Sequence, residues 1–78
     1  MPNNTVSRAM CIRALLRAGF RHVESSGGFS ILERAGRSVL IPEFAQLEPE
    51  IVDVVLAAAR VTREEFETLL WAEMLSCA

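Results

Sequence analysis

Two tight turns between three short strand-forming runs constrain this 78-residue chain more than any other feature. The stretch Gly19–Pro42 reads GFRHVESSGGFSILERAGRSVLIP, with Gly27-Gly28 in its first turn and Gly36 in its second. Adjacent glycines supply the positive φ angles that a tight hairpin needs, and the alternating or β-branched runs around them favour strands. Residues 20–42 therefore predict a three-stranded antiparallel meander. Helices must cover one of its faces, because an isolated sheet of this size is only marginally stable.

The segments on both sides of the meander predict these helices. Ser7 is a suitable N-cap and Gly19 a suitable stop for a helix over 7–18. Pro49 fits the first turn of a second helix over 49–60, since proline is favoured at that position. Both helices are rich in apolar residues and are expected to pack on the sheet.

A third helix is predicted over 62–76. Thr62 followed three residues later by Glu65 has the spacing of a capping box, in which each side chain bonds the backbone of the other. We therefore predict a single α+β domain over 1–78, with an N-terminal extension over 1–6 and the element order α-β-β-β-α-α.

Helical spacing also predicts which side chains are buried. The second helix is apolar over most of its circumference and is expected to be buried on more than one side. In the other two helices the expected core-facing residues are Cys11, Ile12, Leu15, Leu16 and Ala18, and then Phe66, Leu70, Met74 and Cys77.

Trp71 and Leu75 lie four residues apart and off the core-facing stripe of the last helix, among glutamates. One interpretation is that the fold wraps around and buries both. The other is that they form a dimer or partner interface, since large exposed apolar pairs often mark contact surfaces.

Charge is distributed unevenly along the chain. Residues 1–42 carry a net charge of +4 and residues 43–78 a net charge of −6, which gives −2 overall. Such an asymmetry either reflects ordinary solvated faces or presents one face to an anion and another to a cationic partner. The candidate phosphate-binding residues are Arg13, Arg17, Arg21, Arg34 and Arg37.

The composition argues against several classes of protein. No apolar run approaches the roughly 18 residues that span a membrane, and residues 1–5 do not resemble a signal peptide, so we expect a cytoplasmic protein without membrane contact. Cys11 and Cys77 are too few and too far apart for a metal site or a disulfide framework. Motifs for phosphate-binding loops, nucleophile elbows and metal clusters are absent from the sequence, so we expect no metal and no cofactor.

Several short motifs occur in the order and spacing of one known family. They are Ala18-Gly19-Phe20, the turn glycine Gly27, Ile41-Pro42, Leu47 with Pro49, and Thr62 with Glu64-Glu65-Phe66. On these residues, the chain resembles the HicA toxins, which are small messenger-RNA-cleaving proteins with a fold like that of the double-stranded-RNA-binding domain. The resemblance covers residues 8–70 and implies pairing with an antitoxin protein.

The resemblance departs from the family pattern at the residue that matters most for catalysis. In the family this turn reads Gly-Ser-His, with the histidine as the catalytic group, and this chain has Phe29 in the histidine position. Cleavage through a 2′-hydroxyl needs a group that accepts a proton near neutral pH, which phenylalanine cannot do. His22 on the first strand is the only histidine and is a candidate for a relocated base; a structural role is the alternative.

Three functions follow from these observations. The first is a non-catalytic binding domain that contacts a protein partner or a second copy of itself, with Trp71 and Leu75 as interface candidates. The second is an RNA-binding domain without cleavage, which uses the five arginines named above. The third is an active ribonuclease toxin in which His22 or an unrecognised group serves as the base.

Overall fold

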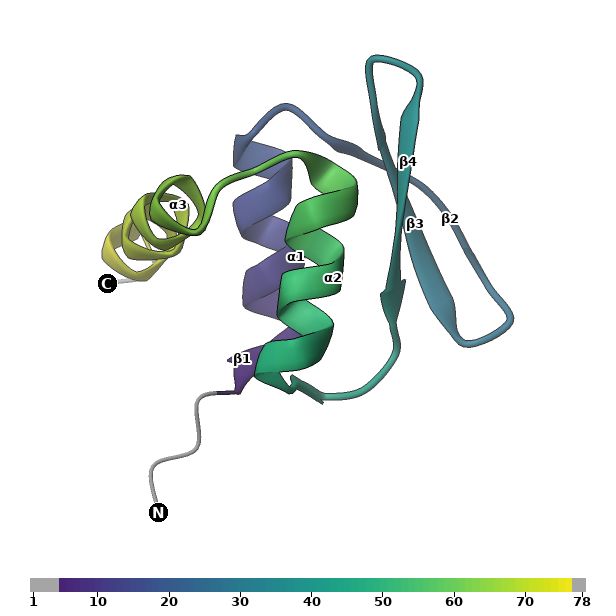
Figure 1. Ribbon diagram of the computed structural model, residues 1–78, viewed down its shortest axis with the longest axis horizontal. Helices are drawn as coiled ribbons and strands as arrows, with labels where there is room; N and C mark the ends of the chain where they lie inside the picture. Colours follow the sequence, from purple (N-terminus) through teal and green to yellow (C-terminus); the bar gives the residue numbers. More distant parts are fainter. Residues whose placement is uncertain (1–4, 77–78) are drawn as a thin grey trace.

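In the computed structural model, which describes residues 5–76, three helices are combined with a three-stranded antiparallel sheet and a small two-stranded one (Figure 1). The predicted α+β class and the order of the main elements are confirmed. The elements are β1 (Val6–Ser7), α1 (Arg8–Arg17), β2 (Arg21–Ser26), β3 (Phe29–Arg34), β4 (Arg37–Pro42), β5 (Gln46–Leu47), α2 (Pro49–Ala59) and α3 (Arg63–Ser76).

The meander β2-β3-β4 is built on two turns of the same kind. Gly27 and Gly28 have φ angles of 59° and 83°, and Ala35 and Gly36 have φ angles of 52° and 77°. Two consecutive positive φ angles define the type I′ turn, whose twist matches that of the flanking strands. Both turns were predicted from their glycines. The second places an alanine in the left-handed region, which costs about 1 kcal/mol relative to glycine.

The register of the strands separates a buried face of the sheet from an open one. Leu32 is paired with Val39 and Ser30 with Ile41, and all four side chains are buried. Because side chains alternate across a strand, the intervening residues point to the other face, which none of the helices within residues 5–76 covers (Figure 1). β2 is exposed along its whole length. A register shift between His22 and Glu24 marks a bulge in that strand.

The helices form two layers on the buried face. α2 packs on β4, while α1 contacts β2 and is itself covered by α3 on the side away from the sheet (Figure 1). The predicted caps are confirmed: the Ser7 hydroxyl accepts a hydrogen bond from the Met10 amide at 3.4 Å. Thr62 and Glu65 bond each other's backbone amides at 2.9 and 3.1 Å.

The residues expected to face the core in α1 and α3 are mostly buried or partly buried. Cys11, Leu15 and Phe66 are fully buried, and Ile12, Ala18 and Leu70 are partly buried against the core. The expectation is wrong for Leu16 and Met74, which are 41% and 56% exposed, and Val54 on α2 is 69% exposed. They face outward because α1, α2 and α3 each have only part of their circumference covered by neighbouring elements. Cys77 lies outside the described residues.

A two-residue pairing that the sequence analysis did not anticipate joins the starts of α1 and α2. β1 pairs antiparallel with β5, with Val6 opposite Leu47. The Arg8 amide adds a hydrogen bond to the Ala45 carbonyl at 3.0 Å. The N-terminal ends of the two helices are therefore held together by backbone hydrogen bonds.

Arg34, at the end of β3, joins the opposite ends of the same two helices. Its Nη1 donates to the Ala18 carbonyl at 2.7 Å, and its Nη2 donates to the Ala59 carbonyl at 3.4 Å. The guanidinium also lies over the Phe20 ring, 4.5 Å from its centroid. Helix C-termini carry unpaired carbonyls and a partial negative charge. A guanidinium there donates hydrogen bonds to the carbonyls and its positive charge interacts favourably with the partial negative charge.

We expect Arg34→Met to lower the free energy of unfolding by about 2–3 kcal/mol, because charge-assisted hydrogen bonds to two helix ends are lost. Arg21 provides the matched control, since its exposed ion pair with Glu33 (3.2 Å) lies on the open face of the sheet. Arg21→Met should cost less than about 1 kcal/mol. Urea denaturation followed by circular dichroism measures both; equal losses would show that Arg34 does not join the helices.

Candidate functional site

Phe29 lies at the start of β3, directly after the first turn, and is 41% exposed. Its partner across the strands is Pro42, and its side chain points to the open face of the sheet. Leu40 lies on the same face and is 54% exposed. The position where the family resemblance requires a histidine is therefore part of an apolar surface.

This surface continues around the edge of β4 onto α2 and forms a groove of about 380 Å³. The sheet contributes Phe29, Leu40 and Pro42, and the helix contributes Glu50, Ile51, Val54 and Val55. Among these described residues, Glu50 is the only charged one. Exposed apolar residues that gather in a concave site are typical of binding surfaces.

A second apolar surface lies on α3, far from the sheet (Figure 1). Trp71, Met74 and Leu75 are 63%, 56% and 71% exposed. Residues at these spacings share one face of a helix. The interpretation in which the fold buries Trp71 and Leu75 is wrong. Their role as interface residues remains a prediction, and Met74 joins them on that surface.

His22 lies on β2 and is exposed. Its Nε2 is 3.0 Å from the Ser25 hydroxyl. The two residues share a face of the strand because the bulge inserts an extra residue between them. His22 is paired with Leu32, whereas Phe29 is paired with Ser26 next to the turn, so His22 does not occupy the position of the missing histidine.

The structure does not bring the five candidate arginines onto one face. Arg17 bonds Glu73 and Ser76 of α3, and Arg21 pairs with Glu33 on the open face of the sheet. Arg34 reaches the helix ends on the buried face, as described above. Arg13 is exposed on α1, and Arg37 is exposed at the second turn. The role of these residues in RNA binding stays a prediction.

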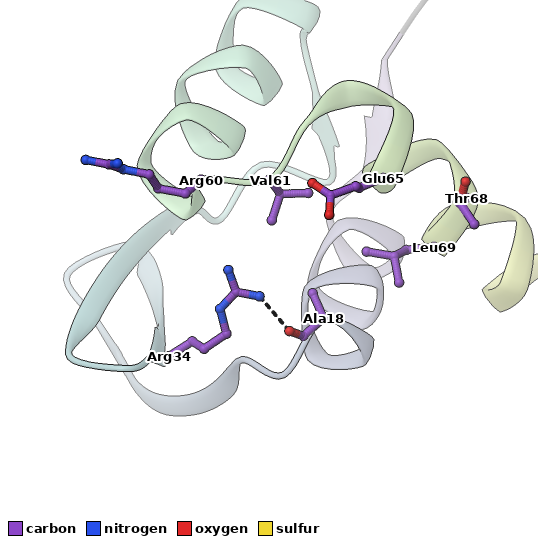
Figure 2. A pocket seen from close by; sticks show the side chains of 7 residues that line it. All are labelled: Ala18, Arg34, Arg60, Val61, Glu65, Thr68 and Leu69. Atoms are coloured by element: carbon purple, nitrogen blue, oxygen red, sulfur yellow. Dashed lines mark hydrogen bonds between the residues drawn. The ribbon is translucent and has the colours of Figure 1, made fainter.

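Another hollow, of about 340 Å³, lies where α1 and α2 end and α3 begins (Figure 2). The Arg34 guanidinium points into it, whereas Arg60 points away. The Glu65 carboxylate on its rim accepts the hydrogen bond from the Thr62 amide, and this bond lowers the pKa of Glu65 below its ordinary value of 4.5. Both charged groups that face the hollow thus bond helix termini, and we assign this hollow a structural role.

Leu40 and Val54 are the two most exposed apolar residues of the groove, and sequence reasoning did not place them in a site. The alternation in Ser38-Val39-Leu40-Ile41 could have placed Leu40 opposite the buried pair Val39 and Ile41. Val54 gives no comparable signal, because it follows Asp53 within a helix that is apolar nearly all round.

Within residues 5–76, no helix has both the length and the apolar character that a membrane span requires. The same residues include no group of three or more histidine, cysteine, aspartate or glutamate side chains that could hold a metal ion.

Comparison with known proteins finds no family model, no curated protein and no solved structure that matches this chain.

The capping box makes a prediction about pH. A lowered pKa in the folded state means that ionised Glu65 stabilises the fold above the ordinary glutamate pKa and that this contribution is lost as the pH falls below 4.5. Glu65→Gln keeps a hydrogen-bond acceptor but cannot titrate, so it should flatten the fall in thermal midpoint between pH 5 and pH 3. Glu24→Gln, on exposed β2, is the control and should keep the wild-type slope. An unchanged slope for Glu65→Gln would show that ionised Glu65 does not stabilise the fold.

Proposed function

We propose that this chain is a non-catalytic binding domain on a HicA-like scaffold, and that it acts through protein–protein contact. The observation that carries the proposal is the apolar groove around Phe29. The residue at the family's histidine position has no proton-accepting group, and its neighbours in the groove are the apolar side chains of Leu40, Pro42 and α2.

The charges around the groove also favour protein over RNA. Phosphate contacts from Lys and Arg supply most of the affinity for nucleic acid. The described residues that line the groove include Glu50 but no cation. Glu43, which follows β4, pairs with Arg8 at 3.8 Å, so its charge is balanced by a cation. A protein surface can fill such a groove with apolar side chains, whereas a phosphate backbone would find no cation among the described residues that line it.

Titration of a fluorescent RNA duplex at low and at physiological salt tests the proposal against its RNA-based alternatives. We expect no cleavage and little binding at either salt concentration. Binding that weakens steeply with salt would contradict the proposal and support an RNA-binding domain. Cleavage by the wild type that His22→Ala abolishes would establish an active ribonuclease.

The variant Phe29→His tests whether a histidine at this position is enough to give the chain ribonuclease activity. We expect the variant to remain inactive on the same RNA, because the described residues that line the groove include Glu50 but no cation to hold a phosphate. Phe29→Leu is the control for loss of the aromatic ring. Cleavage that appears in the histidine variant alone would show that the scaffold is built for RNA, and would overturn the proposal.

A further inference from the structure

We propose that the groove binds an extended segment of a protein partner, which adds to β4 as an antiparallel strand with its basic N-terminal end beside Glu50. This inference rests on the proposed function, because it names the partner of the same surface. Three observations carry it: the unpaired backbone of β4, the placement of apolar side chains on both sides of that backbone, and the charges at its two ends.

The hydrogen-bonding phase of β4 leaves one set of backbone groups directed away from β3. A two-residue turn makes its flanking pair, Arg34 and Arg37, a hydrogen-bonded pair. The bond from the Glu43 amide to the Gly28 carbonyl, at 2.9 Å, has the same phase. The amides and carbonyls of Ser38 and Leu40 therefore point outward, and β4 is an edge strand with no further strand beside it among residues 5–76.

The side chains beside this edge fit an added strand. Successive side chains of a strand point to opposite faces. Those on the open face of the sheet would contact Phe29 and Leu40, and the alternate ones would contact Ile51 and Val54 of α2. Backbone bonds to an edge, with alternate side chains entering pockets, are the general form of strand addition. The occupant should therefore carry small or medium apolar residues at alternate positions.

The charges around β4 set the direction of the added strand. Arg37 is exposed at the start of β4, and Glu50 and Glu43, the latter paired with Arg8, are exposed at its other end. An antiparallel strand with a basic N-terminal residue and an acidic C-terminal residue would pair with charges at both ends, whereas a parallel one would place its carboxyl terminus beside the glutamates. Antiparallel pairing is also the more stable geometry per residue.

The opposite edge of the sheet, β2, has features that prevent strand addition, and β4 lacks most of them. β2 carries a bulge at Val23 and the charged side chains of Arg21 and Glu24, and both features discourage edge-to-edge pairing. On β4, only the last residue, Pro42, lacks an amide that could bond an added strand, and Leu40 exposes an apolar side chain beside the edge. The two edges of one small sheet thus differ in the way expected if β4 is used for binding.

The probe is the peptide Lys-Val-Thr-Val-Thr-Val-Glu, and its charge-reversed isomer Glu-Val-Thr-Val-Thr-Val-Lys is the matched ligand control. We expect the first peptide to shift the amide resonances of Ser38 and Leu40 in heteronuclear NMR spectra of the full chain. The isomer should bind about fivefold more weakly, since it places like charges at both ends. Equal affinities, or shifts that spare β4, would overturn the proposal.

Variants of the protein test the surface itself. Ser38→Pro removes one outward amide without breaking a bond to β3, and Leu40→Glu adds charge to the groove; each should weaken binding about tenfold or more. Val23→Glu makes the matched change on β2 and should leave the affinity unchanged. Circular dichroism verifies that each variant is folded. If Ser38→Pro and Leu40→Glu bound the peptide as tightly as the wild type does, strand addition would be contradicted.

Sedimentation velocity without peptide separates a partner from a second copy of the chain. We expect a monomer. Self-association that Leu40→Glu abolishes would assign the groove to a second copy and overturn the partner proposal, but would leave the proposed protein contact intact. Trp71, the chain's single tryptophan, reports on the surface of α3, and its emission should not change when the peptide binds. An emission shift without shifts in β4 would place binding on α3 instead.

Discussion

Among residues 5–76, the Arg34 guanidinium ties the sheet to the C-terminal ends of both helices packed beneath it, and the rest of the fold is arranged around this contact. It donates to the last carbonyls of α1 and α2 and lies on the Phe20 ring. At their other ends, the same helices are joined by the pairing of β1 with β5. The two helices are thus fixed at both ends by hydrogen bonds and between the ends by apolar packing. This arrangement lets a chain with few core residues hold its sheet in one position.

Much of the fold could be predicted from the sequence because its signals are local. Paired glycines determine the first hairpin, Ser7 and the capping box of Thr62 and Glu65 mark two helix starts, and Gly19 marks a helix end; all depend on neighbours within a few residues. β1 and β5 could not be predicted, since two residues show no periodicity. The inward direction of Arg34 could not be predicted either, because its partners come from elements distant in sequence.

The candidate site was less predictable than the fold, because it consists of apolar side chains that the packing of the helices on the sheet leaves exposed. Phe29 drew attention through a family pattern, but its apolar surroundings depend on the register that places Leu40 near it and on the side that α2 turns to β4. Val54 and Met74 occupy helical positions that could face the core in another packing. The arginines illustrate the reverse case: a run of positive charge in the sequence is divided between two faces of a sheet and a helix pair.

The pairing of β1 with β5 has a consequence for the order in which the chain folds. Val6 pairs with Leu47, and the whole meander lies between these two residues in the sequence. The two hairpins need contacts between close neighbours in sequence and can form within microseconds, whereas closing the larger loop carries a greater entropic cost. We therefore expect the hairpins to form first and the pairing of β1 with β5 to limit the rate of folding. Until that step, the inner face of the sheet stays open to water, and the chain is most exposed to aggregation.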